Sequence, residues 1–155
     1  MSILSPAPDA ATLAEIRIAE RLCRGVCRLF EDLGYAALTE FSLTNGRRVD
    51  VIALDGAGGT AIVEIKSSVT DFRTDHKWQD YLDFCDRCYF AVAPEFPQAL
   101  IPAEVGLIIA DDWSGTVIRE SPVFALNGSR RKAQTLRVAL TAALRLRRTV
   151  DPRLD

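Results

Sequence analysis

The stretch from residue 61 to 68, AIVEIKSS, constrains the fold most because it sets two charged residues inside a β-branched, apolar run. Such a run is typical of a buried strand. Side chains alternate between the two faces of a strand, so Glu64 and Lys66 share one face and Val63 and Ile65 share the other. An unpaired charge is costly in a low-dielectric interior, so the first face needs charge pairing, solvent or a cation.

A second acid lies in a second apolar strand, at Asp50 in the stretch GRRVDVIALD. The glycine-rich segment GAGG follows, which is typical of a tight connection between neighbouring strands. Neighbouring strands bring Asp50, Glu64 and Lys66 together, and we predict that they form one charged site. The alternative is a structural ion pair in which Lys66 bridges the two acids without any metal.

The rest of the chain alternates between helical and strand patterns. Besides the two strands already described, we expect a helix over residues 10–33, a strand over 35–43, a helix over 75–86 that is capped by Thr74 or Asp75, a strand over 88–93, a short helical stretch over 97–101, a strand over 105–110, an edge strand over 116–119 and a helix over 130–148. Three early strands form a meander, and the helical crossover makes the fourth parallel to a neighbour. The fold class is therefore α/β, with a central mixed sheet flanked by helices.

Length and composition indicate a single domain over residues 1–155, with an ordered core over about residues 10–148. The chain has 155 residues, of which 48% are hydrophobic, and a net charge of −2. No apolar run approaches the roughly 20 residues of a membrane helix, and the first residues lack the pattern of a secretory signal. We therefore expect a cytoplasmic protein with no membrane partner, and one that does not coat nucleic acid through its overall field.

The two long helices are amphipathic. On the first, the apolar side is formed by Leu22, Cys23, Val26, Leu29, Phe30 and Leu33, opposite Arg17, Arg21, Arg24 and Arg28. On the last, Leu136, Leu140, Ala143 and Leu144 form an apolar seam, and Arg130, Arg137, Arg145 and Arg148 lie along another edge. Apolar seams of this kind usually face the core. The arginines are either an ordinary solvated face or a binding surface for phosphate.

The combination of Asp50 on one strand with Glu64-x-Lys66 on the next resembles the PD-(D/E)XK nuclease superfamily. Over about residues 15–148 the chain resembles the MmcB-like family of bacterial DNA repair proteins within it, through GRRVDVIAL, VEIKSSVTDFRTDHKWQDYLDFCDRCYFAV and GLIIADD. Val49 replaces the proline of the superfamily's name. The resemblance implies a restriction-endonuclease-like core of order αβββαβ, with additional strands and a C-terminal helix.

This resemblance also implies an activity. We expect a metal-dependent DNA nuclease acting in DNA repair, in which Asp50 and Glu64 hold Mg²⁺, with Mn²⁺ as a substitute. By family analogy the carbonyl of Ile65 is a third ligand, and Lys66 orients or deprotonates the attacking water. The alternative is a catalytically silent protein of the same fold that binds DNA or a repair partner.

Further residues are candidates for supporting roles. The auxiliary acids are Glu20, Glu15 and Glu40, and the candidate DNA contacts are Arg47, Arg48, Ser67, Ser68, Lys77, Gln79 and Tyr81. A two-residue turn at Asn45-Gly46 would set Phe41 opposite Asp50 and leave Glu40 on the other face. Because no sequence-reading motif is found, DNA structure or damage is the expected target, and the small size is compatible with a homodimer.

Three other features have simpler explanations. The cysteines form two close pairs, Cys23 with Cys27 and Cys85 with Cys88. This spacing is compatible with a metal or iron–sulfur site, but small buried apolar side chains are the favoured interpretation. His76 is expected to be exposed. Asp111-Asp112 indicates a turn after a buried strand.

Overall fold

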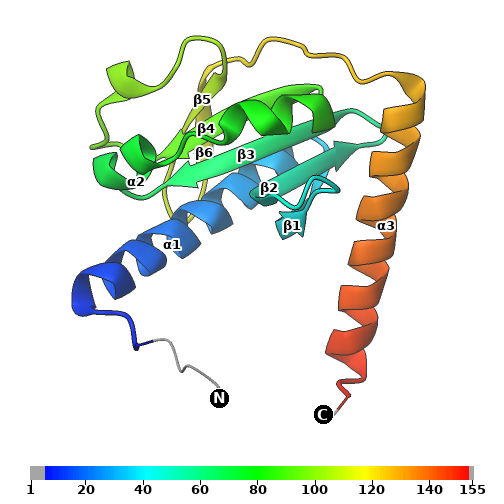
Figure 1. Cartoon of the computed structure of the whole chain (residues 1–155), viewed down its shortest axis with the longest axis horizontal. Coiled ribbons are helices and arrows are strands. Elements are labelled where there is room, and N and C mark those ends of the chain that lie inside the picture. Colours follow the sequence, from blue (N-terminus) through cyan, green and yellow to red (C-terminus); the bar gives the residue numbers. More distant parts are fainter. Residues whose placement is uncertain (1–5, 154–155) are drawn as a thin grey trace.

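The computed structural model describes residues 6–153, and a six-stranded sheet in the order β1-β2-β3-β4-β5-β6 runs through it (Figure 1). Expectations for residues 1–5 and 154–155 lie outside this range. The elements are α1 (Ala10–Asp32), β1 (Tyr35–Ser42), β2 (Arg48–Asp55), β3 (Thr60–Lys66), α2 (Val69–Thr74), the 3-10 helix η1 (Trp78–Phe84), β4 (Arg87–Val92), the 3-10 helix η2 (Gln98–Leu100), β5 (Gly106–Ala110), β6 (Gly115–Arg119) and α3 (Gly128–Val150).

The sheet is mixed, as the sequence predicted. Strands β1, β2 and β3 form an antiparallel meander, β3 pairs in parallel with β4 and β4 with β5, and β6 pairs antiparallel with β5. The parallel step from β3 to β4 needs a crossover, which α2 and η1 provide. The α/β fold with helices flanking a mixed sheet is therefore confirmed.

Two apolar layers cover the faces of the sheet. Helix α1 packs on one face, where Leu22, Val26 and Phe30 contact a cluster of small and β-branched strand residues. The helix approaches the β5–β6 turn very closely: a Cβ added at Gly25 would lie 2.0 Å from the carbonyl oxygen of Asp111. Segments α2 and η1 cover the opposite face, so both faces of the central strands are buried (Figure 1).

The crossover differs from the single helix expected over residues 75–86. Helix α2 (Val69–Thr74) is capped at its start by Ser68, whose hydroxyl accepts a hydrogen bond from the backbone N–H of Asp71, and Asp75 is the cap residue that follows its end. Asp75 therefore does not cap the start of a helix, and neither does Thr74. The 3-10 helix η1 follows without a side-chain cap, although Tyr81 still packs into the core as its spacing predicted.

The β1–β2 hairpin also corrects an expectation. Its loop has three residues rather than two: the N–H of Leu43 donates to the carbonyl of Arg47 at 2.7 Å, and Gly46 has a φ of 84°. The extra residue shifts the register so that Phe41 pairs with Val49. In this register Glu40, not Phe41, lies opposite Asp50.

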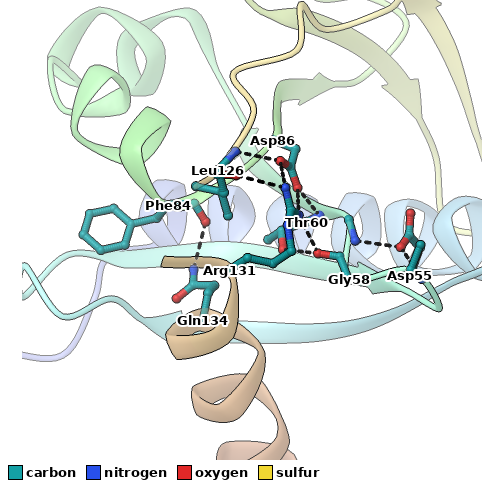
Figure 2. A network of polar contacts seen from close by, with 10 residues as sticks. Asp55, Gly58, Thr60, Phe84, Asp86, Leu126, Arg131 and Gln134 are labelled. Atoms are coloured by element: carbon teal, nitrogen blue, oxygen red, sulfur yellow. Dashed lines mark hydrogen bonds and ion pairs between the residues drawn. The ribbon is translucent and has the colours of Figure 1, made fainter. Parts of the chain in front are cut away.

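Helix α3 is attached mainly by its first turns. The guanidinium of Arg131 donates to both carboxylate oxygens of Asp86, at 2.7 and 2.8 Å, and Asp86 also accepts the N–H groups of Thr60 and Leu126 (Figure 2). One turn later the amide of Gln134 donates to the carbonyl of Phe84. Beyond these turns α3 extends away from the central strands (Figure 1), and its Arg137 and Arg145 donate to backbone carbonyls of β1.

The apolar seam predicted for α3 does not face the core. Leu136, Leu140 and Leu144 are 53%, 64% and 54% exposed, whereas Gln134 and Val138 are the buried residues of this helix. Periodicity located the apolar side of the helix correctly, but the protein packs the other side. The prediction of which side faces the sheet was wrong.

Candidate active site

Asp50 and Glu64 meet where strands β2 and β3 separate. Val51 and Val63 form the pair nearest this end of the ladder, and the same register sets Asp50 opposite Glu64. Beyond this pair, the two carboxylates accept backbone N–H groups in place of backbone carbonyls. The N–H of Asp50 donates to Oε1 of Glu64 at 3.0 Å, and the N–H of Ile65 donates to Oδ2 of Asp50 at 2.8 Å. Each carboxylate is thereby fixed by the backbone of the other strand.

Each carboxylate keeps one oxygen free of these bonds. Within residues 6–153, neither Oε2 of Glu64 nor Oδ1 of Asp50 accepts a hydrogen bond, and no fully buried side-chain oxygen lacks a partner. The two free oxygens are therefore not sealed from solvent. Two hard oxygen donors at the end of a strand pair form a suitable donor set for a divalent cation.

The electrostatics of the pair are unfavourable without a cation. Glu64 is only 5% exposed, and burial together with the neighbouring Asp50 charge raises the pKa of Glu64 from 4.5 to about 9. Burial also raises the pKa of Asp50, although the N–H of Ile65 and the charge of Lys66 act in the opposite direction. Like charges that face each other across strands are destabilising, so this pair favours a proton or a cation.

Lys66 has a partner that sequence reasoning did not identify. Its ammonium lies 2.5 Å from Oδ2 of Asp75, with the two side chains only 6% and 12% exposed, and it lies over the ring of Phe90. Burial acts to raise the pKa of Asp75, but the bonds from Lys66 and from the N–H of Lys77 lower it overall. A lysine in an apolar strand requires a counterion. This requirement was the feature of the sequence that could have predicted an acidic partner for Lys66.

A groove of about 450 Å³ opens beside Asp50, between α1 and residues Thr39 and Glu40 of β1. It is lined by Ile16, Ala19, Glu20, Cys23, Thr39, Glu40, Asp50 and Ile65. Of the acids proposed from sequence, Glu20 and Glu40 share this groove with Asp50, and Glu15 is exposed outside it.

The position of Glu40 depends on an unusual backbone conformation. Glu40 has a φ of 48°. Among residues 6–153 it is the only residue other than glycine with a positive φ. Its carbonyl and that of Thr39 each accept a hydrogen bond from the guanidinium of Arg145 on α3, at 2.7 and 2.5 Å. A positive φ costs free energy for a residue with a Cβ, so Arg145 stabilises a strained backbone conformation beside the groove.

The candidate DNA contacts differ from one another in their exposure and in their hydrogen bonds. Arg47 is engaged by Asp80 through two hydrogen bonds, whereas Arg48, Lys77 and Gln79 are exposed. The hydroxyl and N–H of Ser67 donate to Asp71, and Ser68 caps α2, so both serines stabilise the start of that helix. Tyr81 is buried, and burial raises its pKa.

The remaining polar candidates follow the simpler interpretations. Cys85 and Cys88 are buried and Cys23 and Cys27 partly so, and all four are free thiols. His76 is exposed, and Oδ1 of Asp111 accepts the N–H groups of Trp113 and Ser114 in a turn. Within the described part of the chain, no group of three or more His, Cys, Asp or Glu residues is arranged to hold a metal ion. A magnesium site here would therefore depend on two carboxylates, which is common for this ion.

Together these features define an α/β protein with a charged site where two central strands separate. The family model of MmcB-like DNA repair proteins matches residues 8–153, and the chain belongs to this family. A solved structure of a protein of unknown function from Silicibacter pomeroyi is 43% identical, with a TM-score of 0.84, over 86% of this chain and 92% of that one. No curated protein matches the sequence. No described helix is both long and apolar enough to span a bilayer.

Proposed function

We propose that this DNA repair protein is a metal-dependent deoxyribonuclease of the PD-(D/E)XK type. The observation that carries the proposal is the pairing of Asp50 and Glu64 across separating strands, with Lys66 on the same strand as Glu64. The membership in a DNA repair family supports DNA as the substrate. DNA structure or damage is the expected target rather than a base sequence.

The donor set fits magnesium. Asp50 and Glu64 each keep one oxygen free of protein partners, and their mutual repulsion would be relieved by a divalent charge. We assign both carboxylates as ligands, with the carbonyl of Ile65 as a third, and Mn²⁺ as a substitute. When bound, such an ion supplies an activated water and neutralises charge on the scissile phosphate.

Lys66 has a role defined by its ion pair. Asp75 holds the ammonium of Lys66 at 2.5 Å and so fixes its position. A fixed ammonium beside two acids can orient a water and offset negative charge that builds on a phosphate in the transition state. We therefore propose that Lys66 acts as a group that Asp75 positions beside the two acids.

Cleavage assays test this proposal. The purified protein is incubated with nicked, branched, linear and single-stranded DNA in Mg²⁺ or Mn²⁺, beside Asp50→Asn, Glu64→Gln and Lys66→Met. We expect each variant to lower the cleavage rate by about 100-fold or more. Glu104→Gln is the matched control, because Glu104 is exposed and belongs to no part of the site. Absence of cleavage, or equal cleavage by Asp50→Asn, would reject the nuclease.

The second candidate is an accessory protein that binds DNA or a repair partner without cutting. It is favoured because residues 6–153 contain no group of three or more His, Cys, Asp or Glu side chains that is arranged to hold a metal ion. Calorimetric titration with Mg²⁺ separates the two functions. A nuclease requires an affinity for Mg²⁺ that is lost in Glu64→Gln, whereas an accessory protein shows DNA binding that is indifferent to that substitution.

A further inference from the structure

A groove of about 530 Å³ lies between the first turns of α3, the β1–β2 hairpin loop and the end of η1. Arg130 and Arg137 are the charged residues in its described lining, beside polar side chains that include Asn45, Ser129 and Gln134, and none of the lining residues is acidic. Helix α3 carries seven of the 19 Lys and Arg residues and no acid, although the net charge of the chain is −2. The groove is therefore a positively charged site on an acidic protein.

The two arginines of this groove are held in place but not neutralised. Arg130 donates to the carbonyl of Asp83 at 3.0 Å, and Arg137 donates to the carbonyl of Ser42 at 2.8 Å. Each guanidinium also lies over a phenylalanine ring, 5.1 and 6.0 Å from the ring centroid. Within residues 6–153 neither arginine forms an ion pair. A guanidinium has five N–H donors, so both keep donors and a full charge for a ligand.

Arg148 continues the same edge of α3. It follows Arg130 by eighteen positions, which is five helical turns, so the two side chains share one side of the helix about 27 Å apart along its axis. Arg148 is exposed and forms no ion pair among the described residues, whereas Arg147 beside it pairs with Asp151. Charges spread over this length fit a chain of phosphates better than one small anion.

We propose that this groove and the edge of α3 beyond it bind the sugar–phosphate backbone of DNA, at a place separate from the two acids. The ligand is the DNA of the proposed function, on which this assignment rests. Arg130 and Arg137 donate to phosphate oxygens, and Asn45 and Ser129 add neutral donors. Backbone phosphates carry no sequence information, so the site positions DNA without selecting its bases.

The first residues of β2 connect this groove to the acid pair. Arg137 binds the carbonyl of Ser42, and Ser42 pairs with Arg48, which is exposed and precedes Asp50 by two positions. A strand of DNA seated along α3 therefore lies beside the end of the sheet at which the two acids meet.

A neighbouring groove between the hairpin loop and η1 is less suitable for phosphate. Its lining includes Asp80 and Asp83. Asp80 pairs with Arg47 at 2.9 Å, so the charge of this arginine is already compensated. Carboxylates repel phosphate, and we assign DNA binding to the acid-free groove alone.

Fluorescence anisotropy of a labelled DNA duplex tests the site with the full chain in EDTA, where binding is measured apart from metal-dependent cleavage. Ala133→Glu sets a carboxylate in the groove and leaves both arginines in place. It should raise the DNA dissociation constant about tenfold or more at low salt. Ala139→Glu is the matched control: Ala139 is also an exposed alanine of α3, but it lies outside the groove, so this variant should bind DNA as the unchanged protein does.

Salt dependence gives a second measurement. Replacing Arg130 and Arg137 together by Gln should lower the slope of log Kd against log salt by about 2, equally for duplexes of unrelated base sequence. Circular dichroism checks the fold of each variant. Three results would overturn the site: an unchanged protein that binds no DNA at low salt, an unaltered Kd in Ala133→Glu, or equal weakening by Ala133→Glu and Ala139→Glu. DNA binding that Ala133→Glu weakens in a protein that cuts no DNA would reject the nuclease and leave this site standing.

Discussion

The acidic pair should make the metal-free protein less stable as pH rises, which is opposite to the behaviour of carboxylates held in ion pairs. The folded-state pKa of Glu64 is about 9, above its ordinary value of 4.5. A carboxyl group whose folded-state pKa is raised binds more protons in the folded than in the unfolded chain. Its contribution to stability is fully present below pH 4.5 and is lost as pH rises toward 9.

The magnitude follows from the same linkage. A tenfold change in proton affinity corresponds to about 1.4 kcal/mol, so the free energy of unfolding should fall by about 3 kcal/mol between pH 4.5 and pH 7. The raised pKa of Asp50 acts in the same direction. Asp75 and Asp86 have lowered pKa values, so their stabilisation is complete above pH 3.8 and adds no slope in this range.

Urea unfolding from pH 5 to pH 8 in EDTA measures this slope. Glu64→Gln keeps the shape of the side chain but cannot ionise, and it should flatten the curve, whereas Glu104→Gln at an exposed position should leave it unchanged. Added Mg²⁺ should stabilise the protein more at pH 8 than at pH 6, because it favours the ionised pair. Stability that rises with pH in EDTA, or a slope that persists in Glu64→Gln, would refute the electrostatic argument.

Three further predictions concern elements around the site. Asp75→Asn leaves the ammonium of Lys66 buried without its carboxylate, so urea unfolding should show a loss of about 3–5 kcal/mol, and a loss below 1 kcal/mol would mean that the pair is solvated. Gly25→Ala forces its Cβ against the carbonyl of Asp111, so calorimetry should show destabilisation of about 2 kcal/mol or more instead of the gain usual in a helix. Arg145→Gln removes two charge-assisted bonds to the carbonyls of Thr39 and Glu40 in β1, so amide hydrogen exchange there should accelerate about tenfold or more, and unchanged exchange would show that other contacts hold this part of β1.

The strand order and the meeting of the two acids could be predicted from sequence because they depend on local rules. Alternation along β3 sets Glu64 and Lys66 on one face, and the glycine-rich turn at residues 56–59 pairs β2 with β3. Once these strands are neighbours, Asp50 can lie only a few positions from Glu64. The structure brings these acids together, although what they do chemically stays a prediction.

The misses depend on information that local patterns do not contain. The register of β1 against β2 changes with one residue of loop length, and this shift decides whether Phe41 or Glu40 lies opposite Asp50. The pairing of Lys66 with Asp75 joins a strand to the end of a helix nine positions later. Two acids, Asp71 and Asp75, lie in that interval, and only the packing of α2 selects Asp75.

The orientation of α3 is the most informative of these misses, because it connects two parts of the molecule. Arg145 reaches the strained backbone at Glu40 from the second half of α3. A change that loosens this half of the helix would therefore act, through Arg145, on the groove that contains Asp50.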